Sequence, residues 1–173
     1  MVKKKDGTLR TCLDFRALNK KIVKNIYHIP SIDELMDELH GSNFFSNIDL
    51  RSSYHQIRMR EEDIPKTAFK CHYGHFDFFV MHFGLKNTPT TFQSCIKNIF
   101  HKQIRNVVLV FFEDILIYNK TWKEHLHHLE EVLKILHDHS LFAKLSKCDF
   151  GLTETLYLKK TLVKMVLRWI WRK

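Results

Sequence analysis

Apolar residues recur every three or four positions in three segments of the chain, the spacing that places them on one face of a helix. These segments are 31–41, 89–102 and 122–141. Ser31 suits the start of the first helix as its cap, and Gly41 suits its end. In the third segment one side of the expected helix carries four leucines, Leu126, Leu129, Leu133 and Leu136. The histidines His125, His127 and His128 are then expected on a solvated face.

Runs rich in Val, Ile and Phe predict strands between these helices. The longer runs are 44–50, 107–112 and 115–118, and shorter ones lie at 147–150 and 156–158. Segments 68–71 and 76–81 are typical of an aromatic hairpin with its turn at 72–75. Helices and strands are mixed but do not alternate as strict βαβ units. The pattern therefore predicts an α+β fold in one compact unit, with an antiparallel sheet and helices packed on one face.

Composition narrows the function classes. The chain has 173 residues and a formal net charge of +9, with 45% hydrophobic residues. That is long enough for a real core, and the positive charge favours a polyanionic partner such as nucleic acid. No apolar stretch reaches the roughly 20 residues of a membrane span, and no signal peptide opens the chain, so we expect an intracellular protein without a membrane partner.

Acidic residues interrupt two of the apolar strand-like runs. Asp49 follows Phe44–Ile48, and Glu113 and Asp114 separate Phe112 from Ile115. Acidic residues are common at hairpin turns, which is the plain alternative for the pair. A buried Asp49, however, needs a partner. If neighbouring strands bring the three carboxylates together, their repulsion requires cations, and hard ions such as Mg²⁺ prefer oxygen ligands.

Several segments, in their order and spacing, resemble those of a known enzyme family. They are VKKKDG at 2–7, LDFRALN at 13–19, IDEL at 32–35, FSNIDLRS at 45–52, YHQI at 54–57, KTAF at 66–69, FGL at 83–85, Pro89 with TFQ at 91–93, and VLVFFEDILIY at 108–118. Over residues 2 to about 158 the chain closely resembles the reverse transcriptase of gypsy-type long-terminal-repeat retrotransposons. It resembles retroviral reverse transcriptases more distantly.

The resemblance implies a fingers and palm fold whose palm sheet carries the catalytic carboxylates of an RNA-directed DNA polymerase. It implies two Mg²⁺ ions, a dNTP substrate and an RNA or DNA template with primer. The positions that match catalytic and metal-binding carboxylates are Asp49, Glu113 and Asp114. Those that match nucleotide-binding residues are Lys4, Arg10, Ser52, Ser53, Tyr54 and Phe83. Judged without the motifs, Tyr54 and Phe83 read as core aromatics, and Lys4 and Arg10 as a solvated hairpin tip.

The sequence also departs from the family. Glu113 stands where the family has the first Asp of a pair, and the extra methylene displaces the carboxylate. Residues 1–158 are interpreted as a partial reverse transcriptase domain and 159–173 as an unrelated tail, of which 161–173 is expected to form a terminal helix or to fray. We expect a truncated or degenerate copy whose parent polyprotein carries the thumb and ribonuclease H regions.

Two functions stay open at this point. One is an RNA-directed DNA polymerase, and the other is a catalytically inactive retroelement remnant with weak nucleic-acid binding. A nuclear element and an insertion in an organellar genome, such as the mitochondrial one, would have the same sequence pattern. The compartment and the oligomeric state are therefore left open.

Overall fold

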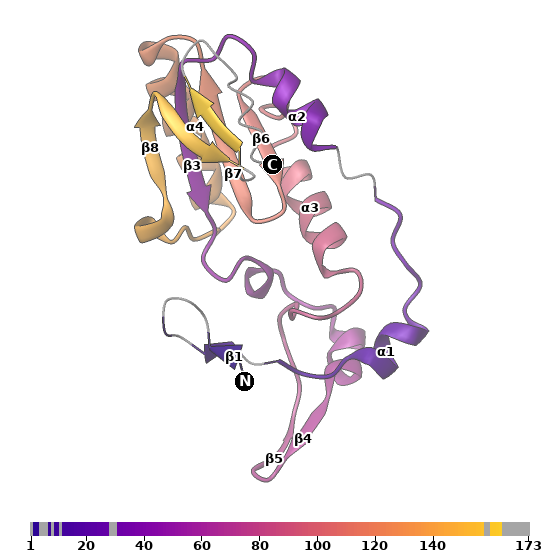
Figure 1. Ribbon diagram of the computed structural model, residues 1–173. Helices are drawn as coiled ribbons and strands as arrows, with labels where there is room; N and C mark the ends of the chain where they lie inside the picture. Colours follow the sequence, from indigo (N-terminus) through magenta and orange to yellow (C-terminus); the bar gives the residue numbers. More distant parts are fainter. Residues whose placement is uncertain are drawn as a thin grey trace. The chain divides into compact units, whose positions relative to one another are not determined.

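The computed structural model describes residues 2–3, 7, 9–10, 12–27, 31–157 and 160–163 (Figure 1). It divides into two compact units that interleave along the chain. Unit 1 comprises Met1–Tyr27 and Ser52–Phe92, and unit 2 comprises His28–Arg51 and Gln93–Lys173. The expectation of one compact unit is wrong. Because the chain passes between the units three times within continuous segments, no linker composition marks the division.

A four-stranded antiparallel sheet forms the centre of unit 2. Its strand order is β6, β7, β3, β8. The bounds are Val108–Phe111 for β6, Asp114–Asn119 for β7, Phe44–Asp49 for β3 and Asp149–Leu152 for β8. The β3–β7 register runs without a slip from Phe44 opposite Asn119 to Asp49 opposite Asp114. The predicted mixture of helices and antiparallel sheet is confirmed.

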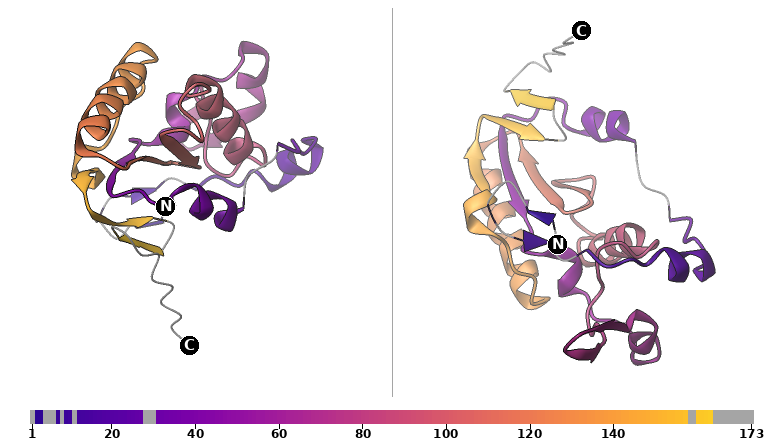
Figure 2. Two further views of the ribbon diagram at one scale, coloured as in Figure 1. Left: turned by 90° about the horizontal axis from the view of Figure 1, so that it is seen from above. Right: turned by 60° about the horizontal axis from the view of Figure 1, so that its bottom comes forward.

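One face of this sheet carries the main hydrophobic core of unit 2. Side chains alternate between faces along a strand, so Phe45 and Asp49 of β3 point to the same side. Phe45, Leu116 and Tyr118 pack there against α2 (Ile32–Glu38) and the hairpin of β9 (Glu154–Tyr157) and β10 (Lys160–Val163). Figure 2 shows α2 and this hairpin on the opposite side of the sheet from α4, so the prediction that the helices pack on one face is wrong.

Ser31 caps α2 as predicted, since its hydroxyl accepts a hydrogen bond from the Glu34 amide at 3.2 Å. The helix ends at Glu38, with Leu39 rather than Gly41 at its C-cap.

Helix α4 (Trp122–Asp138) covers the other face through polar as well as apolar contacts. His125 is fully buried, and its Nδ1 lies 3.0 Å from Asn119 Oδ1. Nδ1 therefore carries the proton, so Nε2 accepts from the Ser46 hydroxyl at 2.7 Å. That hydroxyl in turn accepts from the Gly151 amide at 2.9 Å. This network joins α4 to β3, β7 and β8.

The network corrects the predicted orientation of α4. Its buried residues are His125, Val132 and Leu136, whereas Leu126 and Leu133 are 48% and 43% exposed. The side of the helix that carries the four leucines therefore does not coincide with its buried face. The prediction of a solvated His125 is wrong, because hydrogen bonding compensates for its burial.

Unit 1 is built from short elements. They are β1 (Val2–Lys3), β2 (Leu9–Arg10), α1 (Arg16–Lys21), η1 (Ser53–Gln56), η2 (Glu61–Thr67), β4 (Phe69–Cys71) and β5 (Gly74–Phe76). Helix α3 (Thr88–Ile99) begins in unit 1 and ends in unit 2. The aromatic hairpin is present, but its second strand is β5 rather than the predicted 76–81, and only His72 and Tyr73 separate the strands. Among the described residues, no helix is long and apolar enough to cross a membrane.

The end of the described chain differs from expectation. Residues 160–163 form β10, which pairs antiparallel with β9, and Leu162 is only 1% exposed. The prediction of a terminal helix or frayed tail is therefore wrong for residues 161–163, and 164–173 lie outside the described residues. A tertiary strand pairing decides this segment, and local periodicity does not encode it. The predicted domain boundary after residue 158 stays a prediction.

We predict that Leu162→Ala lowers the free energy of unfolding of the unit that contains it. Deleting a fully buried leucine side chain costs about 2 to 5 kcal/mol. The matched control is Leu145→Ala, since Leu145 is 76% exposed and surface changes stay within about 0.5 kcal/mol. Urea denaturation followed by circular dichroism measures both. Equal, small effects of the two variants would show that β10 is not part of the core.

Candidate functional site

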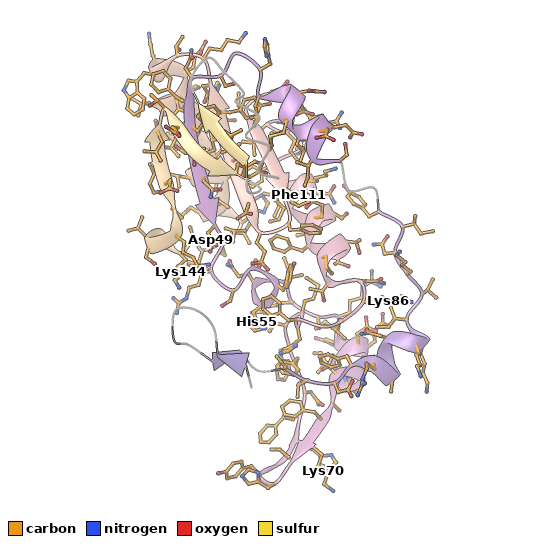
Figure 3. The ribbon with its side chains drawn as sticks, viewed as in Figure 1. Asp49, His55, Lys70, Lys86, Phe111 and Lys144 are labelled. Carbon is orange, nitrogen blue, oxygen red and sulfur yellow. The ribbon has the colours of Figure 1, made fainter. Side chains whose placement is uncertain are left out.

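Two aspartates face each other at the end of the central strand pair. Asp49 is the last residue of β3 and Asp114 is the first of β7, and they are direct cross-strand partners. Residues paired in this way have Cβ atoms about 4.5 to 5.5 Å apart. Figure 3 shows Asp49 where β3 ends. The apolar pairs that precede them, such as Ile48 with Ile115, are fully buried and hold this register.

The turn of the β6–β7 hairpin carries the third carboxylate. Phe111 pairs with Asp114, so Phe112 and Glu113 form a two-residue turn. Phe112 has a φ of +53°, the left-handed region that bulky residues rarely adopt. Glu113 is half-buried and directly precedes Asp114. The structure thus brings the predicted residues Asp49, Glu113 and Asp114 to one end of the sheet.

Electrostatic repulsion acts within this group. The pKa of Asp114 lies above its ordinary value, first because burial disfavours the charged carboxylate, and then because of the negative charges of Asp49 and Glu113. Lys147 acts in the opposite direction and lowers the pKa of Asp114. Three carboxylates therefore lie within electrostatic reach of one another, and a cation there would stabilise the ionised forms.

A lysine supplies part of that positive charge. Lys147 ends the short helix η3 (Leu145–Lys147), and its Nζ lies 3.0 Å from Asp49 Oδ2. The backbone strengthens this connection, since the Lys144 amide donates to the Asp49 carbonyl at 2.8 Å. The Asp49 side chain is 20% exposed and that of Lys147 is 52% exposed. A metal ion that bound Asp49 would compete with the Lys147 ammonium group.

The carboxylate oxygens at this end of the sheet are ligands of the kind that a hard divalent cation prefers. Among the residues that the structure describes, no group of three His, Cys, Asp or Glu side chains is arranged to hold a metal ion. Mg²⁺, however, commonly binds through one or two carboxylates together with substrate phosphates rather than in an all-protein cage. The Asp49–Asp114 pair supplies two such ligands.

The predicted nucleotide-binding residues that the structure describes lie in unit 1. Tyr54 is 9% exposed, with its ring centroid 4.7 Å from that of Phe83 and 5.3 Å from that of Phe92. Ser52 has a φ of +48° and precedes η1, and Ser53 is fully buried. Tyr54 is thus buried like a core aromatic, whereas Phe83 is half-buried, and the role of both at a nucleotide site stays a prediction.

Lys4 and Arg10 are the two basic residues of the predicted nucleotide-binding set. Lys4 lies outside the described residues. Arg10 belongs to β2, where its backbone pairs with Val2 of β1. The β1–β2 pairing agrees with the hairpin that the sequence suggests for this segment, while the roles of Lys4 and Arg10 stay predictions.

Comparison with known proteins decides the family. The model of the family described as reverse transcriptase (RNA-dependent DNA polymerase) matches residues 2–164. The chain belongs to the reverse transcriptase family. The Transposon Tf2-3 polyprotein of Schizosaccharomyces pombe is 38% identical to it over 157 residues, which is 91% of this chain. The Tf2-7 polyprotein of the same organism is 37% identical. The chain spans 12% of the length of each of these relatives.

Solved structures agree with this assignment of the fold. A foamy viral protease-reverse transcriptase in complex with double-stranded DNA superposes with a TM-score of 0.87 at 24% identity, over 94% of this chain and 28% of that one. The same type of protein in complex with an RNA/DNA hybrid gives a TM-score of 0.85 at 24% identity, over 94% and 22% of the two chains. The reverse transcriptase fold expected from the resemblance is confirmed.

Sequence reasoning missed two residues beside the carboxylates of this reverse transcriptase domain. Lys147 contacts Asp49 across a separation of 98 positions, and no local pattern signals such a pair. Tyr157 of β9 is 1% exposed, and its pKa lies above its usual range through burial and the charge of Asp114. Its hydroxyl therefore lies within electrostatic reach of Asp114.

We predict that Lys147→Met tightens Mn²⁺ binding at the carboxylates. Removing the ammonium group from Asp49 removes its competition with the metal. The expected change in Kd is about two- to fivefold, because an exposed ion pair contributes up to about 1 kcal/mol. Titration followed by the free Mn²⁺ electron paramagnetic resonance signal measures this change.

The matched control for that titration is Lys134→Met, which removes the same charge from an exposed position on α4. Its Kd should equal that of the unmodified protein. An unchanged or weaker affinity for Lys147→Met would contradict the competition.

Proposed function

We propose that this domain is the catalytic part of an RNA-directed DNA polymerase, which transfers a nucleotide from a dNTP to a primer 3′-hydroxyl. The observation that carries the proposal is the pairing of Asp49 with Asp114 at the end of β3 and β7. Two carboxylates in direct register, with the pKa of Asp114 raised, are costly for stability. A reaction that requires a bound cation would explain why the protein keeps this destabilising pair of carboxylates.

Asp49 and Asp114 are the residues proposed to hold the metal, with Glu113 as the third carboxylate. Two Mg²⁺ ions, when bound, activate the attacking hydroxyl and neutralise charge on the triphosphate. The β3–β7 register fixes the spacing of the two aspartates, and the hairpin turn sets the direction of Glu113. Lys147 keeps the charge of Asp49 partly neutralised before any metal binds.

The nucleotide would be bound by residues of unit 1. We assign Tyr54 to the sugar, where an aromatic ring excludes a 2′-hydroxyl sterically and so favours a dNTP over an rNTP. Its packing against Phe83 and Phe92 supports this, since a ring fixed on two sides can act as a rigid barrier. Phe83, the backbone of Ser52 and Ser53, and the charges of Lys4 and Arg10 are proposed to complete the site.

A template with its primer is the proposed macromolecular partner. The net charge of +9 supports a polyanion. Solved relatives of this fold were determined in complex with double-stranded DNA and with an RNA/DNA hybrid. We also propose that the thumb and ribonuclease H functions belong to other parts of a parent polyprotein.

Glu113 favours a second candidate, a catalytically inactive remnant that binds nucleic acid weakly. The family pattern has Asp at this position, and a displacement on the order of 1 Å at a reacting centre can cost about 10²-fold in rate. The absence of a three-residue metal group among the described residues agrees with a displaced third carboxylate.

Primer extension separates the two candidates. We predict that the chain as it stands extends a DNA primer on an RNA template negligibly, and that Glu113→Asp raises the rate by up to about 10²-fold. Single-turnover extension with Mg²⁺ and with Mn²⁺, resolved on a gel, measures both rates.

Two variants control this assay. Glu130→Asp makes the same change at an exposed position of α4 and should leave the rate unchanged. Asp114→Asn in the Glu113→Asp background should abolish extension, which excludes a contaminating polymerase. Robust extension by the unmodified chain would refute the effect assigned to Glu113, and no extension by any variant would favour the inactive remnant.

A further inference from the structure

Gln93 of α3 holds the β6–β7 turn from outside the sheet. Its side chain is fully buried. The Nε2 group donates to the Val110 carbonyl at 2.8 Å, and Oε1 accepts from the Phe112 amide at 2.7 Å. A side-chain amide is both donor and acceptor, so each end of Gln93 has a matching backbone partner.

These two hydrogen bonds lie next to the residue that pairs with Asp114. Among the described residues, strand β6 lies at the edge of its sheet, so the outward backbone groups of Val110 have no neighbouring strand to pair with. Val110 and Phe112 flank Phe111, the residue that pairs with Asp114. Gln93 therefore satisfies the backbone on both sides of the residue opposite Asp114.

The turn also requires external support. Phe112 has a φ of +53°, and bulky residues persist in such a conformation only where the surroundings hold them there. The bond from its amide to Gln93 supplies such a restraint. Glu113 follows Phe112 directly, so the direction in which its carboxylate points depends on this restrained backbone.

We propose that Gln93 is a positioning residue that sets the geometry of the carboxylates Glu113 and Asp114 for cation binding. This inference rests on the proposed function of that carboxylate group. Gln93 touches neither the carboxylates nor a substrate, and it acts through the hairpin backbone. Substitutions that disturb the groups holding metal ligands in place typically weaken metal binding 10- to 100-fold.

Two variants test the proposal through Mn²⁺ affinity, measured by electron paramagnetic resonance at pH 6 and pH 8. Gln93→Met keeps the approximate shape but loses both hydrogen bonds, so its Kd should rise about tenfold or more at both pH values. Gln93→Glu keeps a donor and an acceptor when protonated, which burial favours. When ionised, its carboxylate faces the Val110 carbonyl without a proton to donate.

The expected signature is a pH-dependent ratio of the Kd of Gln93→Glu to that of the unmodified protein. It should lie near 1 at pH 6 and rise several-fold at pH 8. The ratio removes the pH effects that the unmodified site shares. Gln103→Glu is the matched control, because Gln103 is also a buried glutamine but bonds to Glu131. Its ratio should stay near 1 at both pH values.

The outcomes separate this inference from the proposed function. If Mn²⁺ binds the unmodified protein no better than it binds Asp114→Asn, the proposed function fails. If Asp114→Asn abolishes binding while both Gln93 variants bind like the unmodified protein at both pH values, only the positioning role fails. Protonated Gln93→Glu preserves both hydrogen bonds, so this variant should be folded at pH 6. It therefore tests the positioning role even if Gln93→Met does not fold.

Discussion

The register between β3 and β7 places Asp49 and Asp114 side by side, and the candidate site depends on that pairing. A slip of one residue would move one aspartate to the opposite face of the sheet. Burial prevents the slip, because Phe45 and Ile48 of β3 lie on different faces and both are almost fully buried. The hydrophobic core thus supplies the energy that keeps the two aspartates paired across neighbouring strands.

The surroundings of the pair show how a folded protein tolerates this repulsion. Lys147 places an ammonium group on Asp49, and burial together with neighbouring charge disfavours ionisation of Asp114. Gln93 meanwhile holds the backbone of the turn that carries Glu113. Each of these contacts joins segments distant in sequence, so the geometry of the site is a property of unit 2 as a whole. A divalent cation bound by the aspartates would take over the role of Lys147.

Local pattern predicted the parts of this structure that local forces determine. The apolar runs around Asp49 and Asp114 predicted their strands, because strand burial requires such runs, and Ser31 predicted the start of α2. The buried face of α4 could not be predicted in the same way, since His125 is buried through hydrogen bonds to Ser46 and Asn119. Strand β10 and the Lys147–Asp49 pair depend on tertiary contacts that leave no periodic signal. The proposed nucleotide-binding residues were identified from motif resemblance and not from periodicity.

Asp49 and Asp114 interact electrostatically, and the proposed function requires this pair to bind a divalent cation. The most direct test is an NMR titration of the Asp114 carboxyl group, in the unmodified protein and in Asp49→Asn, with and without Mg²⁺. We expect a pKa of Asp114 above the ordinary aspartate value, a lower pKa in Asp49→Asn, and a lower pKa when Mg²⁺ is added to the unmodified protein. An ordinary pKa that neither Asp49→Asn nor Mg²⁺ changes would contradict this expectation.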